Sequence, residues 1–158
     1  RPTEKQMKYA TDLGIVIQED MSKADLSAVL DRVLRAPDPK HPLPGAPYGL
    51  LLYAQSIGLQ PSPYIDYEHC IGEITYKLNG ADLCAFYIYA VQMSRLGTSL
   101  SQPTSHPQWP LFQKLGDDMV NDERAYKSLC TRLPEDYINP SHNTLCYKAA
   151  AALMQGIK

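Results

Sequence analysis

Apolar residues recur at the spacing of an α-helix along most of this chain. Almost nothing alternates with the period of two that marks a half-buried strand. Residues 81–96 are apolar on all sides, which is typical of a helix in the middle of a bundle. Residues 111–133 instead carry one apolar face and one charged face. The pattern predicts an all-α fold.

Capping signatures predict where several helices begin. Thr3 with Gln6 has the spacing of a capping box, in which two side chains satisfy free N–H groups of the first turn. Ser22 with Asp25 has the same spacing ahead of an apolar stripe. Asp66 is expected to cap a further helix. These signals place three helix starts before any tertiary contact is considered.

The pattern of residues 9–34 returns 44 residues later, in residues 53–78. Over these 26 paired positions a tyrosine, an alanine, a glycine and the final leucine recur unchanged, and several other apolar groups exchange for apolar groups. A helix, an extended strap and a second helix fit each copy, with Gly14 as the left-handed residue that ends the first helix. Periods of this size usually mean a repeated supersecondary unit, although four identities also arise by chance.

A proline-rich segment divides the chain. Five prolines fall in residues 36–47, a density that no helix or central strand tolerates. We therefore expect a stiff, extended linker there. It separates a small helix-extended-helix unit at 1–35 from a helical bundle domain at 48–158, which opens with the second, divergent copy. In that domain we expect a polar loop at 97–110, followed by one long helix over 111–133.

Composition and charge favour an ordinary globular protein. Hydrophobic residues make up 44% of the chain, and 15 Lys plus Arg nearly balance 17 Asp plus Glu. A dominant nucleic-acid surface normally leaves a basic surplus, which is absent from this composition. The longest apolar run is too short to span a bilayer, and the sequence shows no signal peptide, so we expect a cytoplasmic protein with no membrane contact.

The four cysteines predict neither a metal site nor an essential disulfide. Cys70, Cys84, Cys130 and Cys146 contain no Cys-x-x-Cys pair, whereas zinc ligands usually come as close pairs. Each cysteine lies among apolar neighbours, where a free thiol behaves as a small hydrophobe. We expect buried, reduced thiols, while the even count leaves disulfides open.

Three short motifs in the first unit mark a resemblance to a known class of module. The chain carries, in order, Lys8-Tyr9-Ala10-x-x-Leu13-Gly14-Ile15, Ser22-Lys23-Ala24-Asp25-Leu26 and Leu30-x-Arg32-x-Leu34. These motifs resemble the helix-extended-helix motif of SAP domains and of the related LEM and Rho N-terminal types, over residues 3–35. The head of the unit also resembles small accessory modules of bacterial and phage proteins that handle DNA.

The resemblance implies weak contact with nucleic acid, and with DNA first. A helix N-terminus presents free N–H groups and a positive dipole end to phosphate, and Lys23 lies on such a first turn. The flanking candidates are Lys5, Lys8, Arg32 and Arg35. Acidic residues are interleaved with these positions, so a solvated helical face without a ligand is the alternative.

The second copy predicts a different role. Tyr67 replaces Lys23 and Tyr76 replaces Arg32, so the apolar skeleton is kept while the polar face has changed. This pattern favours packing or docking against protein. The candidate interface residues are Tyr64, Tyr67, Tyr76 and Trp109. Eight of the eleven tyrosines lie between 48 and 126, where stacking on bases, burial in the core and a protein interface are alternatives.

The sequence offers little for catalysis. It has no Gly-rich phosphate loop, and Ser141-His142 near Cys146 has no marked third partner. Acids at 117–118 and 122–123 could pair on Mg²⁺ but are typical of a solvated helix face. We therefore expect no enzyme activity, no cofactor and no metal. The first hypothesis is a non-enzymatic DNA-binding accessory module, and the alternative is a helical protein-interaction adaptor without nucleic-acid contact.

Overall fold

The computed structural model describes residues 1–157, and these residues form nine α-helices, one short 3-10 helix and no strand. The all-α prediction is confirmed. The elements are α1 (Glu4–Asp12), α2 (Lys23–Leu34), α3 (Tyr48–Ser56), α4 (Tyr67–Lys77), α5 (Gly80–Arg95), η1 (Pro103–Ser105), α6 (Trp109–Met119), α7 (Glu123–Cys130), α8 (Glu135–Ile138) and α9 (Leu145–Leu153).

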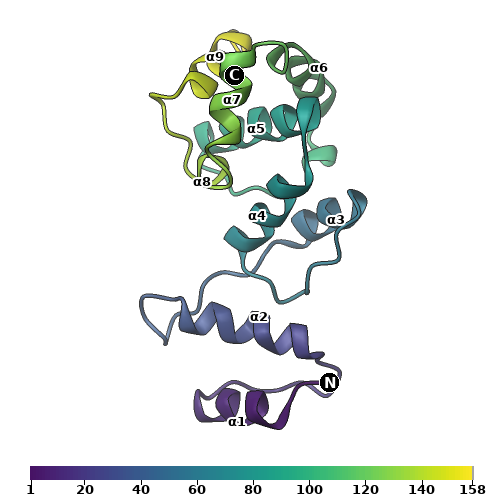
Figure 1. Cartoon of the computed structure of the whole chain (residues 1–158), viewed down its shortest axis with the longest axis vertical. Coiled ribbons are helices and arrows are strands. Elements are labelled where there is room, and N and C mark those ends of the chain that lie inside the picture. Colours follow the sequence, from purple (N-terminus) through teal and green to yellow (C-terminus); the bar gives the residue numbers. More distant parts are fainter. Residues whose placement is uncertain (158) are drawn as a thin grey trace.

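The molecule is elongated, with α1 and α2 at one end, α3 and α4 in the middle and α5 to α9 at the other end (Figure 1). It has two apolar clusters. The larger cluster surrounds α5, whose residues 83–93 are all buried, as expected for a helix in the middle of a bundle. The smaller cluster lies between α1 and α2 around Ala10, Met21 and Leu26. The first unit therefore has a core of its own.

The predicted repeat is present in the helix boundaries of the structure. α1 begins at Glu4 and α3 at Tyr48, and α2 begins at Lys23 and α4 at Tyr67, so both pairs of starts differ by the period of 44 residues seen in the sequence. The two units, residues 3–35 and 47–78, are named the first and second unit below.

The turn between the two helices of each unit also repeats its hydrogen bonds. The Ile15 N–H donates to the Ala10 carbonyl at 2.9 Å, and the Leu59 N–H donates to the Ala54 carbonyl at 3.0 Å. The glycine before each donor is left-handed, with φ of +79° at position 14 and +93° at position 58. Such bonds satisfy carbonyls that a helix C-terminus leaves free. One local structure has thus been used twice.

The capping signatures are confirmed. Thr3 with Gln6 and Ser22 with Asp25 form complete capping boxes at α1 and α2. The Asp66 side chain accepts a hydrogen bond from the His69 N–H at 3.0 Å at the start of α4. These bonds satisfy N–H groups in the first turns.

The prediction of one long helix over 111–133 is wrong. Residues 120–122 break it into α6 and α7, and the first helix already begins at Trp109. The Asp122 side chain accepts from the Ala125 N–H at 3.1 Å and so starts a new helix where the apolar period alone would continue the old one.

The short helix α8 was not predicted. The buried-thiol prediction holds for three cysteines and is wrong for Cys130, which is exposed.

The proline-rich segment 36–47 lies against both units and is partly folded back. Its residues 38–41 form a turn, closed by a hydrogen bond from the His41 N–H to the Asp38 carbonyl. The Leu43 N–H then donates to the Arg32 carbonyl at 2.9 Å, and the Ala46 N–H donates to the Ile65 carbonyl at 2.9 Å. The segment connects the first unit to the second by backbone hydrogen bonds.

Two helical glycines allow a direct test of the packing. Gly72→Ala in α4 is expected to raise the free energy of unfolding by about 0.5 to 1 kcal/mol, because alanine loses less chain entropy than glycine on folding. Its methyl group would meet Pro134 Cγ at an ordinary 3.7 Å. Gly116→Ala in α6 is expected to lower the same quantity by about 1 to 3 kcal/mol. A Cβ there would lie 2.7 Å from the Ala81 carbonyl oxygen of α5.

Urea unfolding of the two variants measures both changes. A stabilised Gly116→Ala protein would contradict the close approach of α5 and α6.

Candidate functional site

A buried carboxylate joins the first unit to the second. Asp66, at the start of α4, is 2% exposed. Its Oδ1 lies 3.4 Å from Arg35 Nη1, which follows α2, and 2.7 Å from His69 Nδ1 on α4. Asp31 of α2 adds a second carboxylate, with Oδ2 3.3 Å from the same His69 nitrogen. We name Asp31, Arg35, Asp66 and His69 the junction cluster.

The distances assign the proton on the His69 ring. The Arg35 guanidinium is also 3.0 Å from His69 Nδ1. A ring nitrogen that carries a proton cannot accept a hydrogen bond. The contacts of Nδ1 with Arg35 and with Asp66 therefore cannot both be hydrogen bonds. The 2.7 Å contact with a carboxylate is the shorter, so Nδ1 carries the proton and donates to Asp66. Arg35 then stabilises the junction cluster through its positive charge and its contact with Asp66.

The junction cluster contains ligand types suited to a divalent cation. One atom each of Asp31, Asp66 and His69 lies within 4.8 Å of the others. However, the Arg35 guanidinium already supplies positive charge 3.4 Å from Asp66 Oδ1 and would repel a cation placed there. The contact between His69 and Asp66 also has the length of a hydrogen bond. The geometry therefore fits an ion-pair cluster better than a metal centre.

A second set of contacts joins residues 62–65 to the first unit. The Ser62 hydroxyl donates to Asp25 Oδ1 at 2.6 Å, and Tyr64 packs against the apolar cluster between α1 and α2. The Ser62 hydrogen bond is the largest cause that lowers the pKa of Asp25 below its ordinary 3.8. The stability from this carboxylate is therefore present above pH 3.8 and is lost as the pH falls through the lower, folded pKa.

The five residues predicted to contact nucleic acid fall into two groups. Lys5, Lys8 and Lys23 are exposed, and none forms an ion pair with any residue between 1 and 157. Arg32 and Arg35 are instead used within the chain. Arg32 Nε donates to the Leu43 carbonyl at 2.8 Å, and Arg35 belongs to the junction cluster. The structure does not bring the five side chains to one free surface.

The N-terminus of α2 is occupied by the chain itself. The Ser22 hydroxyl accepts from the Asp25 N–H at 3.0 Å, and Asp25 Oδ2 accepts from the Ser22 N–H at 3.1 Å. A phosphate approaching this helix end would meet the Asp25 carboxylate, which has the same sign of charge. Any contact of this region with DNA therefore depends on the exposed lysine side chains.

The four aromatic candidates also differ in their placement. Trp109 is 9% exposed and packs edge-on against Tyr53 and Tyr89 in the large core. Tyr67 accepts a hydrogen bond from the Leu100 N–H at 2.8 Å, and Tyr64 contacts the first unit. Tyr76 is 73% exposed. Of this set, Tyr76 is the side chain that presents most of its surface to solvent.

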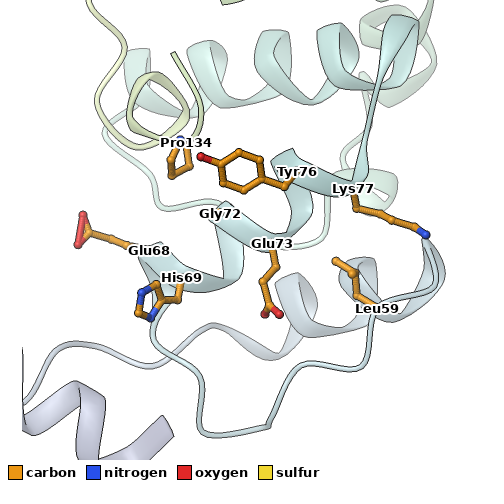
Figure 2. Close-up of a pocket in the computed structure, with 8 residues that line it drawn as sticks. All are labelled: Leu59, Glu68, His69, Gly72, Glu73, Tyr76, Lys77 and Pro134. Atoms are coloured by element: carbon orange, nitrogen blue, oxygen red, sulfur yellow. The ribbon is translucent and has the colours of Figure 1, made fainter. Parts of the chain in front are cut away.

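Tyr76 lies on an apolar groove of about 520 Å³ beside α4. Figure 2 shows its ring reaching toward Pro134, which precedes α8, with Gly72 between them on the helix. Leu59, from the turn after α3, closes the other side. The absence of a side chain at Gly72 gives the groove its depth. Helix α4, a turn and the segment before α8 thus form one apolar surface.

The rim of the groove carries more negative than positive charge. The charged and polar lining residues are Glu68, His69, Glu73 and Lys77. A smaller hollow of about 420 Å³ adjoins it, and His69 and Glu73 line both. That hollow adds Asp31 to the acidic side. Lys77 lies at the opposite end of α4 from Glu68 (Figure 2).

Sequence reasoning found part of this site and missed the rest. It identified Tyr76 as an interface candidate and Asp66 as a cap. It did not identify Leu59, Gly72 or Pro134 as groove residues, because they come from three separate segments. A glycine inside a helical pattern, paired with alanine in the first unit, was the one local signal of a groove floor.

The burial of two thiols is accompanied by raised pKa values. Burial raises the pKa of Cys70 and of Cys84 to about 12. Thiolates are the reactive form of cysteine, so these two groups are unreactive at neutral pH. They serve the core and take no part in the groove.

No helix within residues 1–157 has both the length and the apolar character needed to cross a membrane. No protein-family model, curated protein or solved structure matches this chain.

The junction cluster generates a stability prediction. Asp66→Asn keeps a side chain that caps helices as well as aspartate does, but removes the charge that Arg35 meets. The free energy of unfolding is expected to fall by about 1 to 3 kcal/mol in Asp66→Asn. Asp66→Ala is expected to lose about 1 kcal/mol more, because the cap is lost as well. Urea unfolding measures both values.

The matched control is Asp38→Asn, an exposed carboxylate outside the cluster that is expected to change stability by less than about 0.5 kcal/mol. Native-state hydrogen exchange locates the effect, since amides at 3–34 should exchange faster in Asp66→Asn while those at 83–93 keep their protection. Equal acceleration in both regions would contradict a role as the junction between the units.

Proposed function

We propose that this chain is a helical protein-docking module that binds a segment of a partner protein in the groove beside α4. The observation that carries the proposal is the apolar groove of about 520 Å³ with Tyr76, 73% exposed, on its wall. Tyrosine is enriched among the residues that dominate binding energy at interfaces, since it combines a large apolar area with a polar tip. Concave apolar surfaces with a few polar groups are typical of binding sites.

The two sides of α4 in the second unit also support this proposal. Its α4 keeps apolar residues on the side that faces the large core, where Cys70, Ile71 and Ile74 are fully buried. The opposite side carries an exposed tyrosine where the first unit has Arg32. Packing of the core does not require a large aromatic group in solvent. A contact with another chain would use it.

The test is selection of binding peptides from a random display library by the full chain. Tyr76→Ala should lose the peptides that the unchanged chain enriches, with affinities at least about tenfold weaker, because removing a central aromatic anchor typically costs more than about 1.4 kcal/mol. Fluorescence anisotropy on synthesised peptides measures the change. Since Tyr76 is largely exposed, the variant should fold normally.

The matched control is Tyr48→Ala. Tyr48 is 74% exposed, lies on α3 and does not line the groove. Its loss should leave the selected peptides bound as before. Failure to enrich any peptide whose binding depends on Tyr76 would contradict the proposed docking function.

A second candidate function is weak DNA contact by the first unit. The observation that favours it is the proximity of two lysine-bearing helix starts. Gln6 Nε2 donates to the Ser27 hydroxyl at 2.9 Å. This bond holds the first turn of α1, which carries Lys5, against the first turns of α2, which carry Lys23. Exposed lysines contribute to DNA affinity through neutralised phosphates and released counterions.

This candidate predicts a salt-dependent interaction. Labelled single-stranded and double-stranded DNA should bind at about 50 mM salt, and Lys23→Glu should weaken binding at least about threefold, because it removes one phosphate contact and adds repulsion. Lys114→Glu, a charge reversal on α6, is the control and should have a smaller effect. Absence of binding at that salt concentration, or equal effects of both variants, would exclude the DNA function.

A further inference from the structure

The first unit has a face equivalent to the groove of the second unit, and the repeat identifies its residues. Counting back 44 residues, Leu59, Gly72 and Tyr76 correspond to Ile15, Ala28 and Arg32. Because the helix starts and the turns of the two units coincide under this shift, these residues occupy equivalent positions on the second helix and its turn. The two faces can therefore be compared residue by residue.

In the first unit this face meets a strap from the second unit, residues 62–65, which is a turn closed by a hydrogen bond from the Ile65 N–H to the Ser62 carbonyl at 3.0 Å. The Ser62 hydroxyl donates to Asp25 at 2.6 Å, and Tyr64 packs against the apolar cluster that also includes Ile15 and Val29. Ile65 and Ala28 line the same hollow. An aromatic anchor on a proline-flanked turn thus packs against the first unit.

The proline-rich segment 36–47 satisfies Arg32. The Leu43 carbonyl accepts from Arg32 Nε at 2.8 Å, and the guanidinium lies against Gly45, where an added Cβ would be 3.4 Å away. The first unit's face is therefore covered in part by chain that belongs to the linker and to the second unit. A large exposed apolar patch on a soluble protein usually marks a binding surface, and here the chain covers it.

Residues 79–157 contain no third copy of the unit, and the equivalent face of the second unit stays open. Pro134 borders the groove at Gly72, but Tyr76 extends into solvent and Glu68 and Glu73 line the rim without an ion pair to any residue between 1 and 157. The repeat therefore leaves a vacant counterpart of the place that the strap fills in the first unit.

The charges on the rim of the groove indicate which kind of segment would bind there. Asp25, the residue that the strap contacts in the first unit, corresponds to His69, whose neighbours are Asp66 and Asp31. Glu68 and Glu73 add two exposed carboxylates on the same helix. Arg35 is held by Asp66, and Lys77 lies at the far end of α4. The rim at Glu68 and Glu73 thus favours a cationic group, by charge complementarity.

We infer that the occupant of this groove is a short segment of a partner protein that carries an aromatic side chain next to lysine or arginine residues. The inference rests on the proposed docking function and adds the chemistry of the partner. The aromatic side chain would lie on Gly72 between Leu59 and Pro134, as Tyr64 lies on the first unit. The cationic residues would lie near Glu68 and Glu73.

Three labelled peptides test this occupant by fluorescence anisotropy with the full chain. The first is Lys-Lys-Pro-Ser-Pro-Tyr-Ile-Lys-Lys, which joins the strap sequence to basic flanks. The second has alanine in place of tyrosine, and the third has glutamates in place of the lysines. The first should bind at least about tenfold more tightly than the second, which lacks the aromatic anchor. It should bind about three- to tenfold more tightly than the third, a difference that shrinks in high salt.

Variants of the chain assign the two effects to the groove. Tyr76→Ala should abolish the preference for tyrosine, and Tyr48→Ala should keep it. Glu73→Lys should reverse the preference between the lysine and glutamate peptides, while Glu19→Lys, an exposed carboxylate of the first unit, should not. All four positions are exposed, so the substitutions should leave the fold intact.

The outcomes separate this inference from the proposed function. If display selection yields peptides that depend on Tyr76 but lack aromatic or basic residues, the docking function stands and the inferred chemistry is wrong. If the first peptide binds equally well to Tyr76→Ala, the inference is overturned. Self-association of the chain that Tyr76→Ala abolishes, measured by analytical ultracentrifugation, would identify a second copy as the occupant and would also overturn it.

Discussion

Asp66 is the group on which the arrangement of the two units depends. Its carboxylate is 2% exposed, and an unpaired buried charge costs several kcal/mol. Three donors satisfy it: the His69 N–H, His69 Nδ1 and the Arg35 guanidinium. Two of these donors belong to α4, which Asp66 caps, and the third follows α2. One buried side chain therefore starts α4 and joins it to the end of α2.

The same junction separates the roles of the two units. Arg35 is occupied by Asp66, and Arg32 is occupied by the Leu43 carbonyl, so the positive charge at the end of α2 is used inside the molecule. The strap that carries Ser62 and Tyr64 then packs against the first unit. The second unit has the same backbone plan, but within residues 1–157 no strap packs against its equivalent face in this way. The same backbone plan thus has a covered face in the first unit and an open groove in the second.

Local features of the fold were predictable because they are satisfied within a few residues. The capping boxes at Thr3 and Ser22, the cap at Asp66 and the left-handed Gly14 all form with partners three to five positions away. The break between α6 and α7 shows the limit of this reasoning. Apolar periodicity continued through residues 120–122, but the Asp122 cap outweighed it.

The sequence by itself determined the all-α class, the starts of α1, α2 and α4 and the period of 44 residues, because hydrophobic spacing, caps and left-handed glycines act locally along the chain. Only the tertiary structure decided which charged and aromatic residues are free. Arg35 and Asp66 are 31 positions apart, and the groove joins Leu59 to Pro134. Such contacts depend on how whole elements pack against each other. That packing buried Trp109, occupied two arginines and left Tyr76 on the surface.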